Sequence, residues 1–273
     1  MDAGSTETLI LPVPPEPFAL IVGGAMRGRS VDTLEEALRH MGLRPERVDH
    51  DSSDVIPARF RLQFGTTALL AAPAEGAMLD AANPDHPSTS LLAASLPPNW
   101  RLQGFCWTFI PEHDGDPATS TGQPSQMRDL FKMMVLLIDL FDASHLFWSP
   151  ARLWSDAAQF RAAIAEMLAS GMPPVLHLVA FRRREDVAGA SIQTRGLELF
   201  AGQELEARMP EGWTVADMVK RLSRLALDMM LNGPMQRDRS MRGLESGEWI
   251  DLSPSPGVSG EQSIVIVEFG RDR

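Results

Sequence analysis

Among its 273 residues, the chain has a single cysteine, no tyrosine and only two lysines. One cysteine, Cys106, excludes an internal disulfide and any metal site that needs several cysteine ligands from one chain. Cys106 stands between Phe105 and Trp107, which favours a buried, inert thiol over a nucleophile. The longest apolar run, residues 133–138, is far shorter than the roughly 20 residues that span a bilayer. Since the chain also does not start with a basic segment and an apolar region, we expect a soluble, cytoplasmic protein without a membrane span.

Basic residues are outnumbered, because 25 lysines and arginines face 36 aspartates and glutamates and leave a formal net charge of -11. Such a surface repels phosphate backbones unless a local basic patch compensates. The one basic run, FRRRED at residues 181–186, carries two acids of its own and is most simply a solvated hairpin tip. We therefore expect no nucleic-acid binding.

The clearest local signal is a helix that starts at Thr214. Thr214 is a suitable N-cap, a stripe of apolar residues follows at helical spacing, and residues 232–234 (Asn-Gly-Pro) end the helix. The stripe comprises Met218, Leu222, Leu225 and Met229. Further helices are predicted over residues 125–143, which are apolar nearly all round, and over 155–171. The Pro-led segment 173–181 is apolar on both faces and predicts an internal strand.

The order of the predicted elements indicates the fold class. Residues 17–111 are predicted as β-α-β-β-(α)-β and residues 144–252 as β-α-β-β-α-β, with the apolar helix between them. Each order matches a ferredoxin-like split βαβ unit. The sequence therefore predicts an α+β fold of two ferredoxin-like βαββαβ-type halves joined by a buried apolar helix. One larger mixed sheet with helices is the alternative.

The same pattern divides the chain into three segments. Residues 1–16 end in LPVPPEP and should form a loose, Pro-rich arm. An N-terminal α+β half covers residues 17–122, and a C-terminal α+β half covers residues 123–273. We expect the two halves to pack as one compact unit with a cleft at their junction, where ligand pockets are common.

A weak anion-binding site is conceivable at VGGAMRGRS, where a predicted strand meets a helix. Glycine amides at a helix N-terminus can hold an anion, so the candidates are Gly23, Gly24, Arg27 and Arg29. The spacing matches neither a dinucleotide-binding fingerprint nor a P-loop. The simpler interpretation is that the glycines relieve a tight exit from the strand while the arginines remain in water.

Histidines and acidic loops offer further candidates. His145 and His177 lie in apolar segments that predict core strands, and a facing pair could transfer protons or bind metal. A histidine in such a strand is more often satisfied by a backbone carbonyl. The acidic loops 48–54 and 112–117 lack supporting ligands at a suitable spacing and are interpreted as solvated loops. We therefore predict no metal site and no cofactor.

The segment TRGLELFAGQELE, residues 194–206, carries a family resemblance. Together with HLFWSPARLW and PPVLHLVAF, it resembles an uncharacterised bacterial family known as domain of unknown function 4261, over roughly residues 130–252. The family pattern T-x-G-L-x-x-F-G-x-x-E-L-E is matched by Thr194, Gly196, Leu197, Phe200, Glu204, Leu205 and Glu206. Ala201 replaces the glycine after the phenylalanine. The resemblance implies a bacterial protein and no particular activity.

From the residues themselves, this segment is predicted to be a hairpin or bulged excursion with a tight turn at Ala201-Gly202. Phe200 and Leu205 would hold the excursion down. Its exposed polar candidates for a functional surface are Arg195, Glu204 and Glu206.

These observations favour a binding module over an enzyme, because no serine, cysteine or metal-based catalytic motif is present. The most economical hypothesis is a non-enzymatic module for a small molecule or a protein. An enzyme with scattered acid and base residues is one alternative, and an accessory or neutralising partner in a bacterial secretion or toxin system is another. The sequence leaves open whether the protein is a monomer or a dimer.

Overall fold

The computed structural model describes residues 19–23, 30–48, 59–65, 67–74, 76–92, 95–98, 100–101, 105–111, 124–187, 189–255 and 263–271. The chain forms two compact units, residues 1–177 and residues 178–273. The expected boundary at residues 122/123 therefore lies inside the first unit. The difference arises because the strands and the helix that follow residue 143 belong to the sheet of the first unit.

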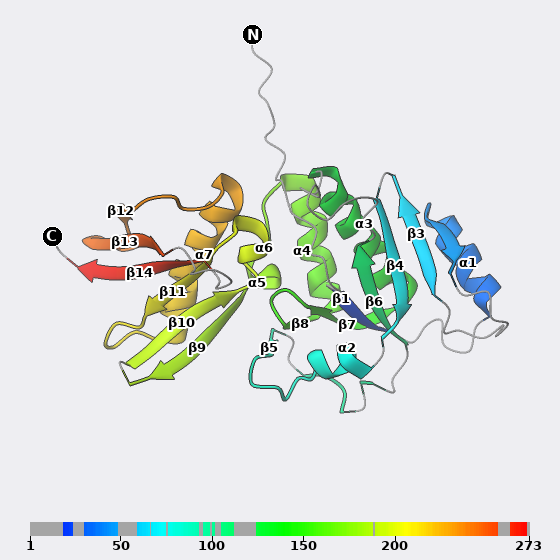
Figure 1. Cartoon of the computed structure of the whole chain (residues 1–273), viewed down its shortest axis with the longest axis horizontal. Helices are drawn as coiled ribbons and strands as arrows, with labels where there is room; N and C mark the ends of the chain where they lie inside the picture. The colour runs from blue at the N-terminus through cyan, green and yellow to red at the C-terminus, as the bar shows by residue number, and fades with distance from the viewer. Residues whose placement is uncertain are drawn as a thin grey trace, which may run out of the picture. The chain divides into compact units, whose positions relative to one another are not determined.

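The first unit is built on an eight-stranded sheet (Figure 1) with the order β2-β3-β4-β6-β1-β7-β8-β5. All neighbouring strands are antiparallel except β5 and β8. The strands are β1 (Ala19–Gly23), β2 (Arg44–Arg47), β3 (Phe60–Phe64), β4 (Thr67–Pro73), β5 (Ser90–Leu91), β6 (Phe105–Pro111), β7 (Ala143–Trp148) and β8 (Leu153–Asp156). Every residue of β1 is buried, as expected for a central strand that is covered on both faces.

Helices cover one face of this sheet. They are α1 (Val31–His40), α3 (Pro124–Leu140) and α4 (Ala157–Ser170), and α3 packs against β4, β7 and α4. Phe131 of α3 stacks on Trp148 of β7, with 5.8 Å between the ring centroids. A small apolar cavity is lined by Leu34 and Leu38 of α1, Leu137 and Phe141 of this helical layer, and Phe60, Leu62 and Ala71 of the sheet. The predicted apolar helix is thus buried within one unit and does not join two halves.

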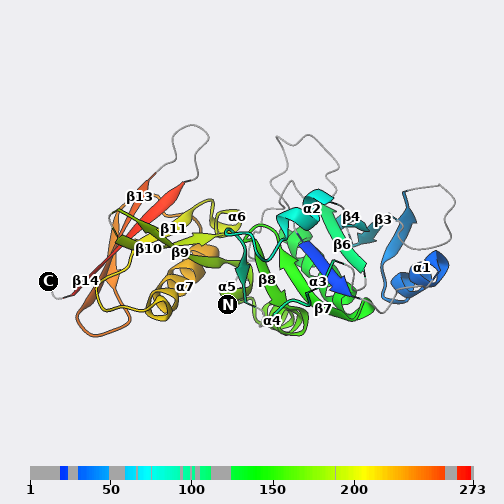
Figure 2. The same cartoon turned by 90° about the horizontal axis from the view of Figure 1, so that it is seen from below.

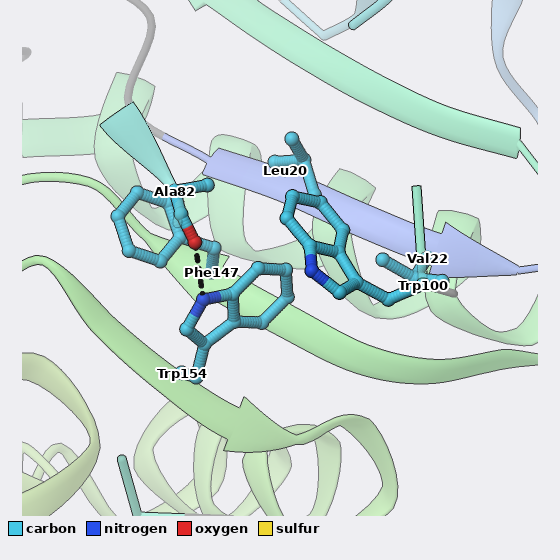
Figure 3. Packing of buried hydrophobic residues seen from close by; sticks show 6 residues of the cluster. All are labelled: Leu20, Val22, Ala82, Trp100, Phe147 and Trp154. Atoms are coloured by element: carbon cyan, nitrogen blue, oxygen red, sulfur yellow. Dashed lines mark hydrogen bonds between the residues drawn. The ribbon is translucent and has the colours of Figure 1, made fainter. Parts of the chain in front are cut away.

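The opposite face is closed by an aromatic cluster (Figure 3). Leu20, Val22 and Phe147 project from β1 and β7 toward Trp154 of β8, and Trp100 stacks edge-on against Trp154 at 5.2 Å. The indole Nε1 of Trp154 donates a hydrogen bond of 2.7 Å to the carbonyl of Ala82. Ala82 follows helix α2 (Gly76–Ala81), so this bond fastens the segment around α2 to the sheet. The sheet of the first unit is therefore covered on one face by helices and on the other by the segment around α2.

The second unit has a six-stranded sheet with the order β12-β13-β14-β11-β10-β9. Its strands are β9 (Ala180–Asp186), β10 (Gly189–Arg195), β11 (Glu204–Arg208), β12 (Arg239–Arg242), β13 (Glu248–Ser255) and β14 (Ile264–Arg271). Two antiparallel three-stranded meanders meet at the parallel pair of β11 and β14. The helix α7 (Val215–Asn232) runs along one face of the sheet (Figure 2).

Several predictions for this region are confirmed. Thr214 caps α7 with its side chain, Asp217 completes a reciprocal capping box, and all four residues of the predicted apolar stripe are buried. Helix α4 ends at Gly171, which adopts a left-handed conformation with a φ of 79°. These are local signals, and each depends on residues within one or two helical turns.

Other predictions for the second half are wrong. The predicted order β-α-β-β-α-β gives way to three strands, one long helix and three strands, because β7, β8 and α4 belong to the first unit. The predicted strand 173–181 is instead a short helix, α5 (Val175–Leu178), followed by β9. Pro173 and Pro174 supply no backbone donor for a sheet and are compatible with the start of a helix. The run FRRRED lies within β9 and is not a hairpin tip. Among the described helices, none has the length and apolar character needed to cross a membrane.

A buried ion pair ties α7 to β13. The guanidinium of Arg221 donates from Nε and Nη2 to the two carboxylate oxygens of Glu248, at 2.5 and 2.9 Å, and both side chains are almost fully buried. Trp213 stacks on the guanidinium at 4.1 Å. Burial alone would raise the pKa of Glu248, but hydrogen bonds from Arg221 and from the Glu245 amide outweigh it and hold that pKa below its usual value.

We expect Gly23→Ala to destabilise the protein by about 1–3 kcal/mol, because a Cβ at this position would overlap the backbone carbonyl of Phe141. Gly76→Ala is the matched control, since a Cβ there meets no atom within 4 Å. Urea-induced unfolding measures both variants. Equal unfolding midpoints for the two would contradict the close approach of β1 and Phe141.

Glu248→Gln should cost about 3 kcal/mol at neutral pH, because it removes the buried counter-charge of Arg221 and leaves only the exposed carboxylate of Glu245, at 3.0 Å, to balance it. A carboxyl with a lowered pKa in the folded state contributes stability above its unfolded pKa, and this is lost as the pH falls through the folded value. The difference in unfolding free energy between the wild type and Glu248→Gln should therefore shrink below pH 4.5. A difference that stays constant on acidification would show that the pair is not ionised.

Candidate functional site

The corner between β10 and β11 is organised by the carboxylate of Glu204. Glu204 is 1% exposed and accepts hydrogen bonds from the backbone amides of Gly196 (2.7 Å), Leu197 (3.3 Å) and Glu198 (3.1 Å). The hydroxyl of Thr194 donates a fourth hydrogen bond of 2.6 Å to Oε2. A concave run of amide groups of this kind is a typical anion-binding arrangement, and here the anion belongs to the chain itself.

The other residues of the corner support this arrangement. Thr194 also accepts a hydrogen bond from the amide of Leu205, so one hydroxyl links β10 to β11 in both directions. The amides that face Glu204 lead into a short helix, α6 (Glu198–Ala201), which ends at Gly202 with a φ of 67°. The predicted glycine turn and the burial of Phe200 and Leu205 are therefore confirmed.

Burial raises the pKa of Glu204 above its usual value, and the hydrogen bonds from Thr194 and the three amides offset this only in part. The prediction that Glu204 is an exposed candidate is wrong. Its carboxylate points into the protein, because four donors satisfy it there. A carboxylate with its oxygens so occupied stabilises a corner and is not poised to take a proton from a substrate.

Glu206 and Arg195 take different positions from Glu204. Both are half-buried, and Glu206 pairs with Gln193 across the β10–β11 ladder. Arg195 pairs with Ala180 at the end of β10. Since side chains alternate along a strand, Gln193, Arg195 and Glu206 face away from the side on which Ile192 is buried.

These residues belong to a larger surface, which we name the open face: the face of the six-stranded sheet opposite α7. Burial alternates along β13 and β14, where Ile250, Leu252, Val265 and Val267 are buried and the residues between them are not. The open face comprises Arg182, Arg184, Ser191, Gln193, Arg195, Glu206, Arg208, Ser240, Arg242, Trp249, Asp251, Ser253, Ile264, Ile266 and Glu268. Sequence reasoning missed it, because Ile266 interrupts the alternation of apolar and polar residues in SIVIVEF.

The two candidate histidines lie apart in the fold. His145 on β7 pairs with Asp156 of β8 across the ladder, and its ring nitrogens interact with the Ser144 hydroxyl and the Ser95 carbonyl, each at 3.0 Å. His177 lies in α5, not on a strand, and its ring meets Phe160 edge-on at 6.0 Å. Burial lowers the pKa of His177 below its usual value. The backbone-carbonyl interpretation therefore holds for His145.

Of the candidate anion-binding residues, the structure describes only Gly23. Gly23 ends β1 where β7 makes a register shift and the chain passes close to Phe141, which agrees with the structural interpretation of this glycine. Gly24, Arg27, Arg29 and the loop 112–117 lie outside the described residues. Among the residues that the structure describes, no group of three or more histidines, cysteines or acids is placed to hold a metal ion.

Glu204→Gln should destabilise the protein by about 2–3 kcal/mol, because the amide nitrogen that replaces one oxygen cannot accept from the backbone donors. Glu206→Gln is the matched control on the same strand and should change the stability by less than about 0.5 kcal/mol, since its side chain is half-exposed. Urea unfolding measures both. Similar small effects at the two positions would refute the anchoring role of Glu204.

Comparisons of the chain with protein-family models, with curated proteins and with solved structures returned no match. The interpretation of the corner and of the open face therefore depends on their own geometry. By that geometry, TRGLELFAGQELE is a structural corner around Glu204, and the open face is the candidate functional surface.

Proposed function

We propose that this chain is a binding module that receives a protein partner on the open face. The observation that supports this most is the exposure of Ile266 in the middle strand pair of the sheet, at 38% of its surface, with Glu206 opposite it on β11 and Ser253 opposite it on β13. In an antiparallel or mixed sheet, a face without its own covering helix is commonly solvated and polar. Ile266 does not stand alone, because the half-buried Ile264 lies two positions before it on the same side of β14, and contiguous apolar surface on a polar face is a feature of an interaction site.

The composition of the open face also supports a protein partner. Arginine and tryptophan are enriched where proteins bind one another, and the described part of the face carries five arginines and the half-buried Trp249. Ser253, which lies opposite Ile266 on β13, is exposed and can form a hydrogen bond to a partner without a change in the backbone. These properties favour a protein interface over a catalytic cleft, which would gather titratable groups in a concave site.

We also propose that the first unit contains a ferredoxin-like core. Its central strands lie in the order β4-β6-β1-β7, and α1 and α3 follow β1 and β6 along the chain. This is the order of a split βαβ unit, in which the first strand lies between the third and the fourth. The strands β2, β3, β8 and β5 then extend the core at its two edges.

A photo-crosslinking amino acid placed at Ile266 tests the partner surface. We expect cells that express this variant to give a discrete adduct with a single protein, because Ile266 would lie against the partner. Ala216, which is exposed on α7, is the matched control position and should give no adduct.

The partner in the adduct is then identified and purified, and its binding to the purified wild-type chain is measured. Ile266→Arg should weaken the binding of the identified partner at least about tenfold, because it places a charge in a desolvated contact. Equal crosslinking from Ile266 and Ala216, or unchanged binding by Ile266→Arg, would exclude the open face as the partner surface.

A further inference from the structure

Two arginines of the open face form a row across three strands. Arg184 of β9 pairs with Ser191 of β10, and Ser191 pairs with Arg208 of β11. Since neighbouring strands lie about 4.8 Å apart, the backbones of the two arginines are roughly 10 Å apart, with the small serine between them. Ser191 is buried, whereas both arginines are exposed. The row therefore has a small buried residue at its centre and an exposed cationic side chain at each end.

Neither arginine forms an ion pair within the described part of the chain, although Glu206 and Glu268 lie near Arg208 on the same face. Arg183, the neighbour of Arg184, points to the opposite side of β9 and pairs with Glu185 at 2.5 Å. Arg184 and Arg208 form no ion pair with any described residue, and Glu206, two positions before Arg208, forms none either. Among the described residues, Arg184 and Arg208 are thus two cationic side chains without an ion pair on one face of the sheet, in a chain whose acids exceed its bases by eleven.

We propose that the row Arg184–Ser191–Arg208 binds carboxylates of an acidic polypeptide segment. This inference rests on the proposed function above, because it specifies the chemistry of the partner that docks on the open face. A guanidinium binds a carboxylate through two parallel N–H donors, so each end of the row can hold one acidic side chain. The segment would lie across β9, β10 and β11.

A protein segment fits this surface better than a nucleic acid does. Proteins that bind single strands on a sheet stack the bases on aromatic rings. The described side chains that β9, β10 and β11 place on the open face include no aromatic ring. Moreover, a long polyanion would meet the acidic remainder of the chain, whereas a short segment presents its charges only to the row.

Fluorescence polarisation with a labelled peptide of alternating serine and glutamate tests the inference in the full chain. The wild type should bind this peptide at low salt and lose it as the salt concentration rises. A peptide of equal length with glutamine in place of glutamate should bind at least about tenfold more weakly, because neutral side chains cannot replace two exposed ion pairs.

The double variant R184A/R208A should reduce binding of the acidic peptide about tenfold. The double variant R224A/R237A is the matched control, since it removes the same charge from exposed arginines outside the open face, and it should bind like the wild type. Circular dichroism and the urea midpoint show whether each variant is folded. Should R184A/R208A unfold, R184K/R208K provides the comparison, because lysine keeps the charge and loses the two-pronged contact.

Equal binding of both peptides, or full binding by R184A/R208A, would overturn the inference. Tighter binding of a single-stranded oligonucleotide than of the acidic peptide would also overturn it and assign the row to nucleic acid. The proposed function fails separately, because crosslinking from Ile266 does not depend on the two arginines. A specific Ile266 adduct without peptide binding would leave the partner surface in place and exclude only its acidic chemistry.

Discussion

Glu204 lies where the two meanders of the second unit meet, and its carboxylate fixes the corner of one of them. Its oxygens hold three consecutive amides and the Thr194 hydroxyl, which sets the end of β10 and the start of β11. The backbone amide of the same residue donates to the carbonyl of Ser263, where β14 begins to pair with β11. The parallel pair of β11 and β14 joins the two meanders. The buried glutamate therefore sets the position of β11, through which the open face continues from one meander to the other.

The hydrogen bonds around Glu204 explain why the residues of the T-x-G-L-x-x-F-G-x-x-E-L-E pattern occur together. Thr194, Gly196, Leu197 and Glu204 are four residues of one hydrogen-bonded corner. Gly196 adopts a φ of 95°, which other residues rarely tolerate, and Leu197 is fully buried beneath the turn. The pattern consequently specifies a local structure and does not point to an activity.

The sequence allowed individual helices and strands to be predicted better than the pairing of the strands in the sheets. Thr214 and the apolar stripe of α7 are local signals, and both are confirmed. The assignment of β7, β8 and α4 to the first sheet depends on pairing with β1, more than a hundred residues away, which no local pattern encodes. Glu204 was misjudged for a similar reason. In ELE it alternates with Leu205 as a solvent-facing residue would, and only the amides of residues 196–198 show that it is buried.

The basic character of the open face follows in part from the burial of two glutamates in the interior of the second unit. Glu248 is buried against Arg221, where hydrogen bonding holds its pKa low, and Glu204 is buried among backbone amides, where burial raises its pKa. Both carboxylates are thereby occupied in the interior, and neither can neutralise an arginine at the surface. Arg184 and Arg208 project from the other side of the sheet, where Glu206 does not pair with them. An acidic chain can therefore present a local cationic row, because two of the acids of this unit are buried in its interior and Glu206 and Glu268 on the open face form no ion pair with the two arginines.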